Sequence, residues 1–181
     1  MRPAAKLLAI LALLPLLTGC GEPDIKLDTE IDLRVSFVDS SWDGVAVPYA
    51  GRCRDCGGAG MSPALRIAGL PPEAHEVVVE FNDLSFLALS EDGGHGTLAM
   101  ATGGAAEIVL PSLREESMKL PQGVRSLRKH RCSPYGHEPG AYKAPCGCGQ
   151  GNVYAATILV MGRAGEKTVK LARTEIALGA F

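Results

Sequence analysis

The residues of this sequence that most readily do chemistry are its six cysteines. Cys53 and Cys56 form a Cys-x-x-Cys pair, and Cys146 and Cys148 form a Cys-x-Cys pair. Cysteines at such spacings form disulfides, bind a metal ion such as zinc, or act as a redox-active dithiol. Which of these applies depends on the compartment, and the compartment depends on Cys20.

Cys20 closes a segment that resembles the export signal of a bacterial lipoprotein. The segment begins with two basic side chains, residues 7–17 are apolar, and two small residues directly precede the cysteine. An apolar run of this length is too short to span a bilayer and is typical of a secretory leader. We therefore expect residues 1–19 to be a signal peptide and the Cys20 thiol to carry a diacylglycerol.

Lipidation of Cys20 predicts a protein anchored to a membrane of the bacterial cell envelope, with residues 20–30 as a tether and residues 31–181 as one domain. Gly21 follows the cysteine, where an Asp usually signals retention in the inner membrane, so the outer membrane is favoured. The compartment is oxidising, which favours disulfides over a metal site or a redox pair. Five remaining thiols cannot all pair, and their pairing stays open.

The rest of the composition argues against several classes of function. The formal net charge is −2, so bulk attraction to nucleic acid is not expected. No Ser/His/Asp or Cys/His order, phosphate-binding loop or pair of carboxylates stands out. We therefore expect no catalytic residues, no metal site and no cofactor, and the sequence does not identify a protein partner.

The elements that position these residues are expected to be β-strands. Alternating apolar residues over 31–37 predict a half-buried strand, and a nearly continuous β-branched run over 76–81 predicts one buried on both faces. Many short strands joined by Gly and Pro are typical of an antiparallel sandwich or barrel. Further strands are expected over 45–47, 96–102, 107–110, 153–161 and 169–178.

One segment has the pattern of a helix. Ser112 is a suitable N-terminal cap with Glu115 three residues later, and Pro121 would end the helix. We therefore expect a helix over 112–120.

A basic run follows this segment. It lacks interleaved aromatic residues and a helical pattern, so a solvated loop is expected, with a patch for lipid headgroups or an anionic partner as the alternative. Its members are Arg125, Arg128, Lys129, His130 and Arg131.

Residues 61–65 read Met-Ser-Pro-Ala-Leu, and a short strand separates them from Gly-Leu-Pro at 69–71. This arrangement resembles the signature of the phosphatidylethanolamine-binding protein (PEBP) family, whose bacterial members are also called Raf-kinase-inhibitor-like proteins. The resemblance covers nearly all of 31–181 and implies a Greek-key β-sandwich with one or two short helices. The other resembling segments, in order, are 45–58, 77–83, 94–96, 120–124, 140–147, 152–154 and 170–175.

The resemblance also implies a small pocket that accepts an anion at one end of the sandwich. By position, the family's Asp, first His and Tyr fall on Asp83, His95 and Tyr154, and its second His falls on Asn152. Tyr142 is a further candidate for ligand binding. An imidazole and a phenol can donate to a phosphate or acetate oxygen, and an Asp can fix the orientation of the imidazole.

This sequence departs from the family pattern near these positions. Asn152 removes a possible positive charge, and residues 82–86 lack the prolines and second acid of the family's loop. Gly94 and Gly96 replace the aromatic residues beside the family's His. Only residues 162–167 separate the last two strands, so the helix that many members carry there is expected to be missing.

The resemblance helps to place the cysteines as well. Cys56 and Cys146 match positions where bacterial relatives often carry cysteines, on loops at the pocket end. We expect a disulfide between the Cys53/Cys56 loop and either Cys132 or the Cys146/Cys148 loop.

Together, these patterns predict a lipid-anchored lipoprotein that binds a small anion or a phospholipid headgroup without catalysis. One alternative is a lipoprotein that handles thiols or metals through Cys53, Cys56, Cys146 and Cys148. Another is a structural envelope protein with a vestigial pocket.

Overall fold

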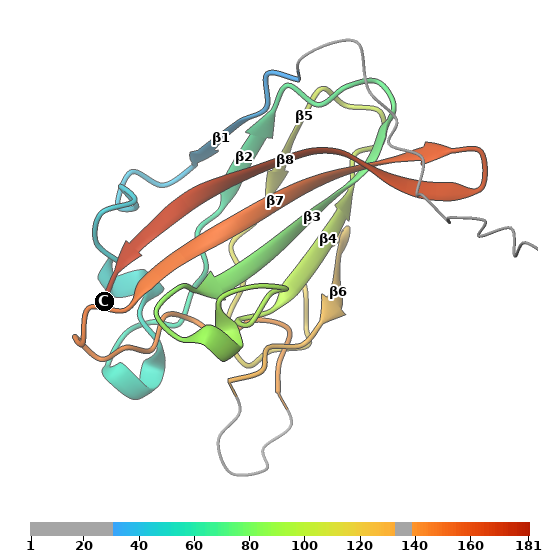
Figure 1. Ribbon diagram of the computed structural model, residues 1–181. Coiled ribbons are helices and arrows are strands. Elements are labelled where there is room, and N and C mark those ends of the chain that lie inside the picture. The colour runs from blue at the N-terminus through green and yellow to red at the C-terminus, as the bar shows by residue number, and fades with distance from the viewer. Residues whose placement is uncertain (1–30, 133–138) are drawn as a thin grey trace, which may run out of the picture.

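Two antiparallel β-sheets pack face to face in the computed structural model of the chain, which describes residues 31–132 and 139–181 (Figure 1). The leader, Cys20 and the tether lie outside the described residues, so lipidation of Cys20 stays a prediction. Within the described ranges, no helix is long and apolar enough to cross a membrane.

The smaller sheet has three strands in the order β1-β2-β5. They are β1 (Arg34–Phe37), β2 (Leu65–Ala68) and β5 (Glu107–Leu110), and β5 coincides with its predicted range. Residues alternate between buried and exposed along β5, as expected for a sheet with one face on the core.

The larger sheet has five strands in the order β6-β4-β3-β7-β8. The central strand β3 contains the buried valines of the predicted two-sided strand. Strands β7 and β8 form a long hairpin with a tight turn, so no helix separates the last two strands. The strands are β3 (Ala74–Asp83), β4 (Thr97–Ala101), β6 (Val124–Arg128), β7 (Val153–Ala164) and β8 (Lys167–Ala180).

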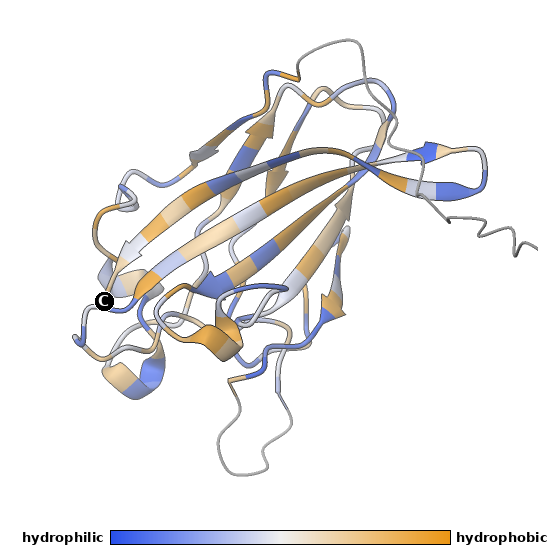
Figure 2. Cartoon of the chain, viewed as in Figure 1, coloured by the Kyte–Doolittle hydropathy of each residue, from blue (hydrophilic) through white to orange (hydrophobic). Residues whose placement is uncertain are grey.

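The core lies between the two sheets and is built from their facing apolar side chains. Figure 2 shows apolar residues along much of β3 and β7, whereas the tip of the β7–β8 hairpin is largely hydrophilic. Burial of each large side chain contributes about 1.5–3 kcal/mol, so this interface is the main source of stability. The members include Leu65, Ile67, Ile108 and Leu110 of the small sheet, and Val77, Val79, Phe81, Leu98, Ile158 and Val160 of the large sheet.

The predicted helix over 112–120 is wrong, because tertiary contacts take the groups that would form it. The hydroxyl of Ser112 donates to the Ser62 carbonyl instead of capping a helix. The amide of Glu115 donates to the Gly60 carbonyl at 2.8 Å, and that of Glu116 to the Tyr142 carbonyl at 3.0 Å. The segment therefore runs as an irregular chain between other loops.

The basic run is largely exposed, as expected, but it is only partly a loop. Its first part is strand β6 at the sheet edge, where Arg125 forms an ion pair with Glu76 at 2.6 Å. His130 is buried, and Arg131 donates to backbone carbonyls of residues 88, 91 and 92. The arginines of the run are therefore exposed but engaged in surface contacts, and only His130 is buried.

Instead of the one or two short helices expected, the described residues contain three single-turn 3₁₀ helices and no α-helix. They are η1 (Tyr49–Gly51), η2 (Arg54–Cys56) and η3 (Leu87–Leu89). The predicted extended piece over 45–47 makes only an isolated parallel bridge, from Ala46 to Ala180. Turns η1 and η2 lie in the loop that carries Cys53 and Cys56, so they shape the cysteine loop.

Replacing Ile158 by Ala should lower the free energy of unfolding by about 2–5 kcal/mol, because the side chain is fully buried in the central part of β7 and leaves a cavity. Val153→Ala on the same strand is the control, since Val153 is 43% exposed, and it should cost less than about 1 kcal/mol. Urea denaturation measures both values. Equal losses would contradict the placement of the core.

Candidate functional site

Four of the five candidate ligand-binding residues lie together at one end of the larger sheet. Asp83 ends β3 and pairs in register with Tyr154 on β7. Asn152 directly precedes β7, and His95 lies two residues before the start of β4 at Thr97. In Figure 1 this is the end nearest the label C. The sandwich therefore brings together positions that are far apart in the sequence.

The carboxylate of Asp83 is held by donors on both oxygens. The side-chain amide of Asn152 donates to Oδ2 at 2.8 Å, and the backbone amide of Ser85 donates to Oδ1 at 2.9 Å. Asn152, which by position replaces the family's second His, thus orients Asp83 in this structure. The contact could not be foreseen, because it depends on how the two strands meet.

His95 is 4% exposed and lies edge-on to the ring of Tyr154, with 5.4 Å between ring centroids. Its Nδ1 lies 2.9 Å from the carbonyl of Lys143, which can only accept, so Nδ1 carries a proton and neutral His95 has a lone pair on Nε2. Burial lowers the pKa of His95, and the Lys143 carbonyl and the Asp83 carboxylate only partly oppose it. His95 is therefore neutral near pH 7.

Tyr154 remains protonated and offers a hydrogen-bond donor. Its hydroxyl oxygen accepts from the Cys146 amide at 3.1 Å. Burial, followed by the nearby Asp83 carboxylate, raises the pKa of Tyr154 to about 12. The phenol proton is therefore retained and can be donated.

Tyr142 packs edge-on against Phe81, with 4.8 Å between ring centroids. Its hydroxyl is buried and has no hydrogen-bond partner among the described residues. Burial raises the pKa of Tyr142 well above its ordinary value, so the group stays neutral. A buried hydroxyl without a partner is costly, and a bound water or a ligand oxygen would satisfy it.

Two disulfides connect the loops that flank this site. Cys53 pairs with Cys146, and Cys56 pairs with Cys148, so the expected link between the two loops is formed. Because the Cys146 amide also binds Tyr154, the disulfide-linked loop contacts the site directly.

Cys132, also a candidate for pairing, is a free thiol. Its Sγ donates to the Gly94 carbonyl at 3.4 Å. Burial raises the pKa of the Cys132 thiol to about 12, so a reactive thiolate is not favoured.

A buried ionic network beside the disulfides was not predicted from the sequence. The Glu115 side chain is 1% exposed and accepts from the Arg54 amide at 2.7 Å. The Lys143 ammonium lies 3.6 Å from Glu115, 3.1 Å from Asp55 and 3.2 Å from Glu116. These pairs tie together the same loops that the disulfides join.

The network keeps Lys143 charged. Burial alone would lower the pKa of Lys143, but the carboxylates of Asp55, Glu115 and Glu116 outweigh it and raise this pKa above its ordinary value. The charge of Lys143 is thus balanced by acids outside the Asp83 cluster. No sequence signal pointed to this network, because its members are scattered and look like surface charges.

Comparison with known proteins identifies the architecture. No family model matches the sequence, and no curated protein matches it. Several solved structures match the fold. One is Escherichia coli YbcL, described as a new member of the mammalian PEBP family, with a TM-score of 0.53 and 17% identity over 82% of this chain and 97% of that chain. The chain has the PEBP fold.

The second match is CT736 from Chlamydia trachomatis, described as a putative PEBP homologue. Its TM-score is 0.52, at 17% identity over 84% of this chain and 98% of that chain. The predicted all-β sandwich of PEBP-like type is confirmed. Identity at this level establishes the fold of the PEBP-like domain, whereas the ligand-binding roles of Asp83, His95, Asn152, Tyr154 and Tyr142 stay predictions.

Removing either disulfide alone should cost only about 2 kcal/mol, because the other already closes the long segment of 92 or 93 residues between the loops. Removing both should cost about 5–7 kcal/mol, more than twice the single loss. The variants are Cys53→Ala/Cys146→Ala, Cys56→Ala/Cys148→Ala and their combination, compared by urea denaturation. Cys132→Ser is the control and should change little. If the combined variant lost only the sum of the two single losses in free energy of unfolding, the disulfides would not substitute for each other, and the prediction would be wrong.

Proposed function

We propose that this protein is a lipid-anchored lipoprotein of the cell envelope whose PEBP-like domain binds a small oxyanion, free or as a phospholipid headgroup, without catalysis. The observation that carries the proposal is the cluster of His95, Tyr154 and Asp83. The unpartnered Tyr142 hydroxyl adds a buried donor on a residue packed against the same strand. Buried polar groups that converge in an apolar domain are typical of small-molecule sites.

Binding of an anion in this cluster is coupled to proton uptake. Neutral His95 carries its one proton on Nδ1, so its Nε2 becomes a donor only when the ring is protonated. A bound oxyanion favours that charged form and raises the pKa of His95 again. Asn152 and Ser85 donate to the two oxygens of Asp83, and the charge of this carboxylate favours the protonated form of His95 that the anion needs.

The cluster is better suited to binding than to nucleophilic catalysis. Tyr154 and Cys132 are the two side chains here that could act as nucleophiles if they were ionised. Burial raises the pKa of each to about 12. Neither is ionised near neutral pH, and an activated nucleophile needs a lowered pKa or an adjacent base. This supports a non-catalytic role.

Sulfate affinity should rise as pH falls from neutral towards the lowered pKa of His95, by up to about tenfold per pH unit, because the bound anion stabilises protonated His95. Sulfate is suitable because its own charge is constant over this range. Isothermal titration of the full chain in neutral detergent measures the affinity. His95→Gln should flatten the pH profile, whereas Tyr154→Phe should weaken binding and keep the profile.

An unchanged pH profile in His95→Gln would overturn the role of His95. Absence of oxyanion or lipid binding in the folded wild-type protein would favour the structural alternative, in which the site is vestigial.

Cys20→Ser should release the protein from the membrane fraction, because acylation requires the thiol. Mass spectrometry of the N-terminal peptide should show a lipid-modified Cys20 in the wild type, and Cys132→Ser should remain anchored. An exported wild-type chain with an unmodified Cys20 would contradict the anchor.

A thiol- or metal-handling function is the second candidate, because the Sγ atoms of Cys53, Cys56 and Cys146 all lie within 4.8 Å of one another. Thiolates at such distances suit Zn²⁺ or Cu⁺. In the structure these sulfurs form disulfides, so the function would require a reduced protein. Native mass spectrometry after dithiol reduction and zinc addition tests it, and a metal-free spectrum would exclude zinc handling.

A further inference from the structure

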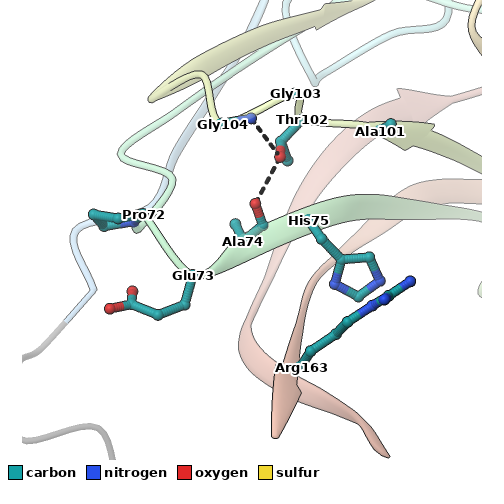
Figure 3. Close-up of a pocket in the computed structure, with 9 residues that line it drawn as sticks. All are labelled: Pro72, Glu73, Ala74, His75, Ala101, Thr102, Gly103, Gly104 and Arg163. Carbon is teal, nitrogen blue, oxygen red and sulfur yellow. Dashed lines mark hydrogen bonds between the residues drawn. The ribbon is translucent and has the colours of Figure 1, made fainter. Parts of the chain in front are cut away.

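A pocket of about 550 Å³ lies at the opposite end of strand β3 from the Asp83 cluster (Figure 3). It is lined by residues 72–75, by residues 101–104 and by Arg163, and it shares no residue with that cluster. Because β3 runs from Ala74 to Asp83, the two ends are about 30 Å apart. Three separate connections of the fold meet here: the approach to β3, the end of β4 and the β7–β8 hairpin.

Arg163 supplies an uncompensated positive charge to this pocket. Its side chain belongs to β7 near the hairpin turn and is exposed. It forms no ion pair with any residue in 31–132 or 139–181. A guanidinium presents a planar fork of donors that matches the oxygens of a phosphate or carboxylate.

His75 adds a buried ring nitrogen to the same pocket. The register of β3 against β7 is interrupted by a bulge at His75, between the Ala74 and Glu76 pairings. A bulge redirects a side chain, and His75 and Arg163 both line the pocket (Figure 3). Its Nδ1 is buried and has no hydrogen-bond partner within the described chain, so a bound group would satisfy it.

The wall opposite His75 is fixed and unobstructed. Thr102 donates its hydroxyl to the Ala74 carbonyl at 2.6 Å and accepts from the Gly104 amide at 3.3 Å, as the dashed lines in Figure 3 show. Gly103 and Gly104 both have positive φ, and a Cβ on either would meet open space. The turn therefore borders the pocket without filling it.

We propose that this pocket is a second binding site, which takes a phosphate-type oxyanion between Arg163 and His75. Glu73 at the rim opposes the anion, but Figure 3 shows its carboxylate directed away from Arg163 and His75. The ligand is either free phosphate or the phosphate of a lipid headgroup. The lipid source is favoured by position, because the predicted tether precedes Asp32, whose carbonyl lies against Gly69, a residue close in sequence to the pocket residues 72–75. That argument, unlike the site itself, rests on the proposed anchoring through Cys20.

Nuclear magnetic resonance of the ¹⁵N-labelled full chain in neutral detergent tests this site separately from the His95 cluster. Inorganic phosphate, in the tens of millimolar or below, should shift the amides of residues 102–104 and of Arg163. A second titration uses micelles doped with phosphatidic acid. Shifts with either probe support the site, and the probe that acts at the lower concentration identifies the source.

Variants that change the charge of the pocket test whether its side chains cause the observed shifts. Arg163→Gln should weaken the binding read out at residues 102–104 by about tenfold, since it removes a charge-assisted contact. Glu73→Gln should tighten the binding several-fold. Lys167→Gln is the matched control, because it removes one positive charge from the same hairpin outside the pocket.

His95→Gln should leave these shifts intact, so failure at one site does not imply failure at the other. Absence of shifts with both probes would overturn the proposal, as would equal weakening by Arg163→Gln and Lys167→Gln.

Discussion

The buried carboxylate of Glu115 is the constraint on which the site end of the molecule depends. A charge in the protein interior is tolerated only when it is paired and hydrogen-bonded, and Glu115 obtains this from Arg54 and Lys143. Those partners lie on two different loops, so satisfying one carboxylate fixes the loops against each other. The two disulfides join the same loops. Covalent and ionic links thus act together at an end of the sandwich that has little regular secondary structure.

This arrangement separates charge from the candidate ligand site. Lys143 is neutralised by acids, Asp83 is held by amide donors, and His95 is buried in its neutral form. The groups that remain available are the Tyr154 phenol, the Tyr142 hydroxyl and one nitrogen of His95. A site of this kind recognises a ligand by a few directed hydrogen bonds and by a protonation change, and bulk charge contributes little.

Strand β3 gives the domain two chemically different ends. At one end it presents Asp83 to the buried cluster, and at the other it carries the bulge at His75, which lines a pocket together with Arg163. Between them the strand is buried on both faces, which makes it a rigid spacer. The first end has no free positive charge among its described members, whereas the second has an exposed guanidinium. The two proposed oxyanion sites would therefore work by different means, through proton uptake at one end and through a fixed cation at the other.

Sequence alone was enough to predict the β-rich architecture and most strand positions, because alternation of apolar residues and turn-forming glycines are local signals. The resemblance to the PEBP family left the partner of the Cys53/Cys56 loop open between Cys132 and the Cys146/Cys148 loop, and the structure settled it. The order of the segments that resemble the PEBP family also placed Asp83, His95 and Tyr154 in one predicted site. Two features depended on the tertiary structure. Residues 112–120 form hydrogen bonds to residues distant in the sequence and not a helix, and Asn152 donates to Asp83. The tertiary structure also decided which charges are buried, since Glu115 and Lys143 look like surface residues until the loops meet. Hydrogen bonds and ion pairs between residues far apart in the sequence leave no local pattern. At both ends of this sandwich, such contacts determine which polar groups are available to a ligand.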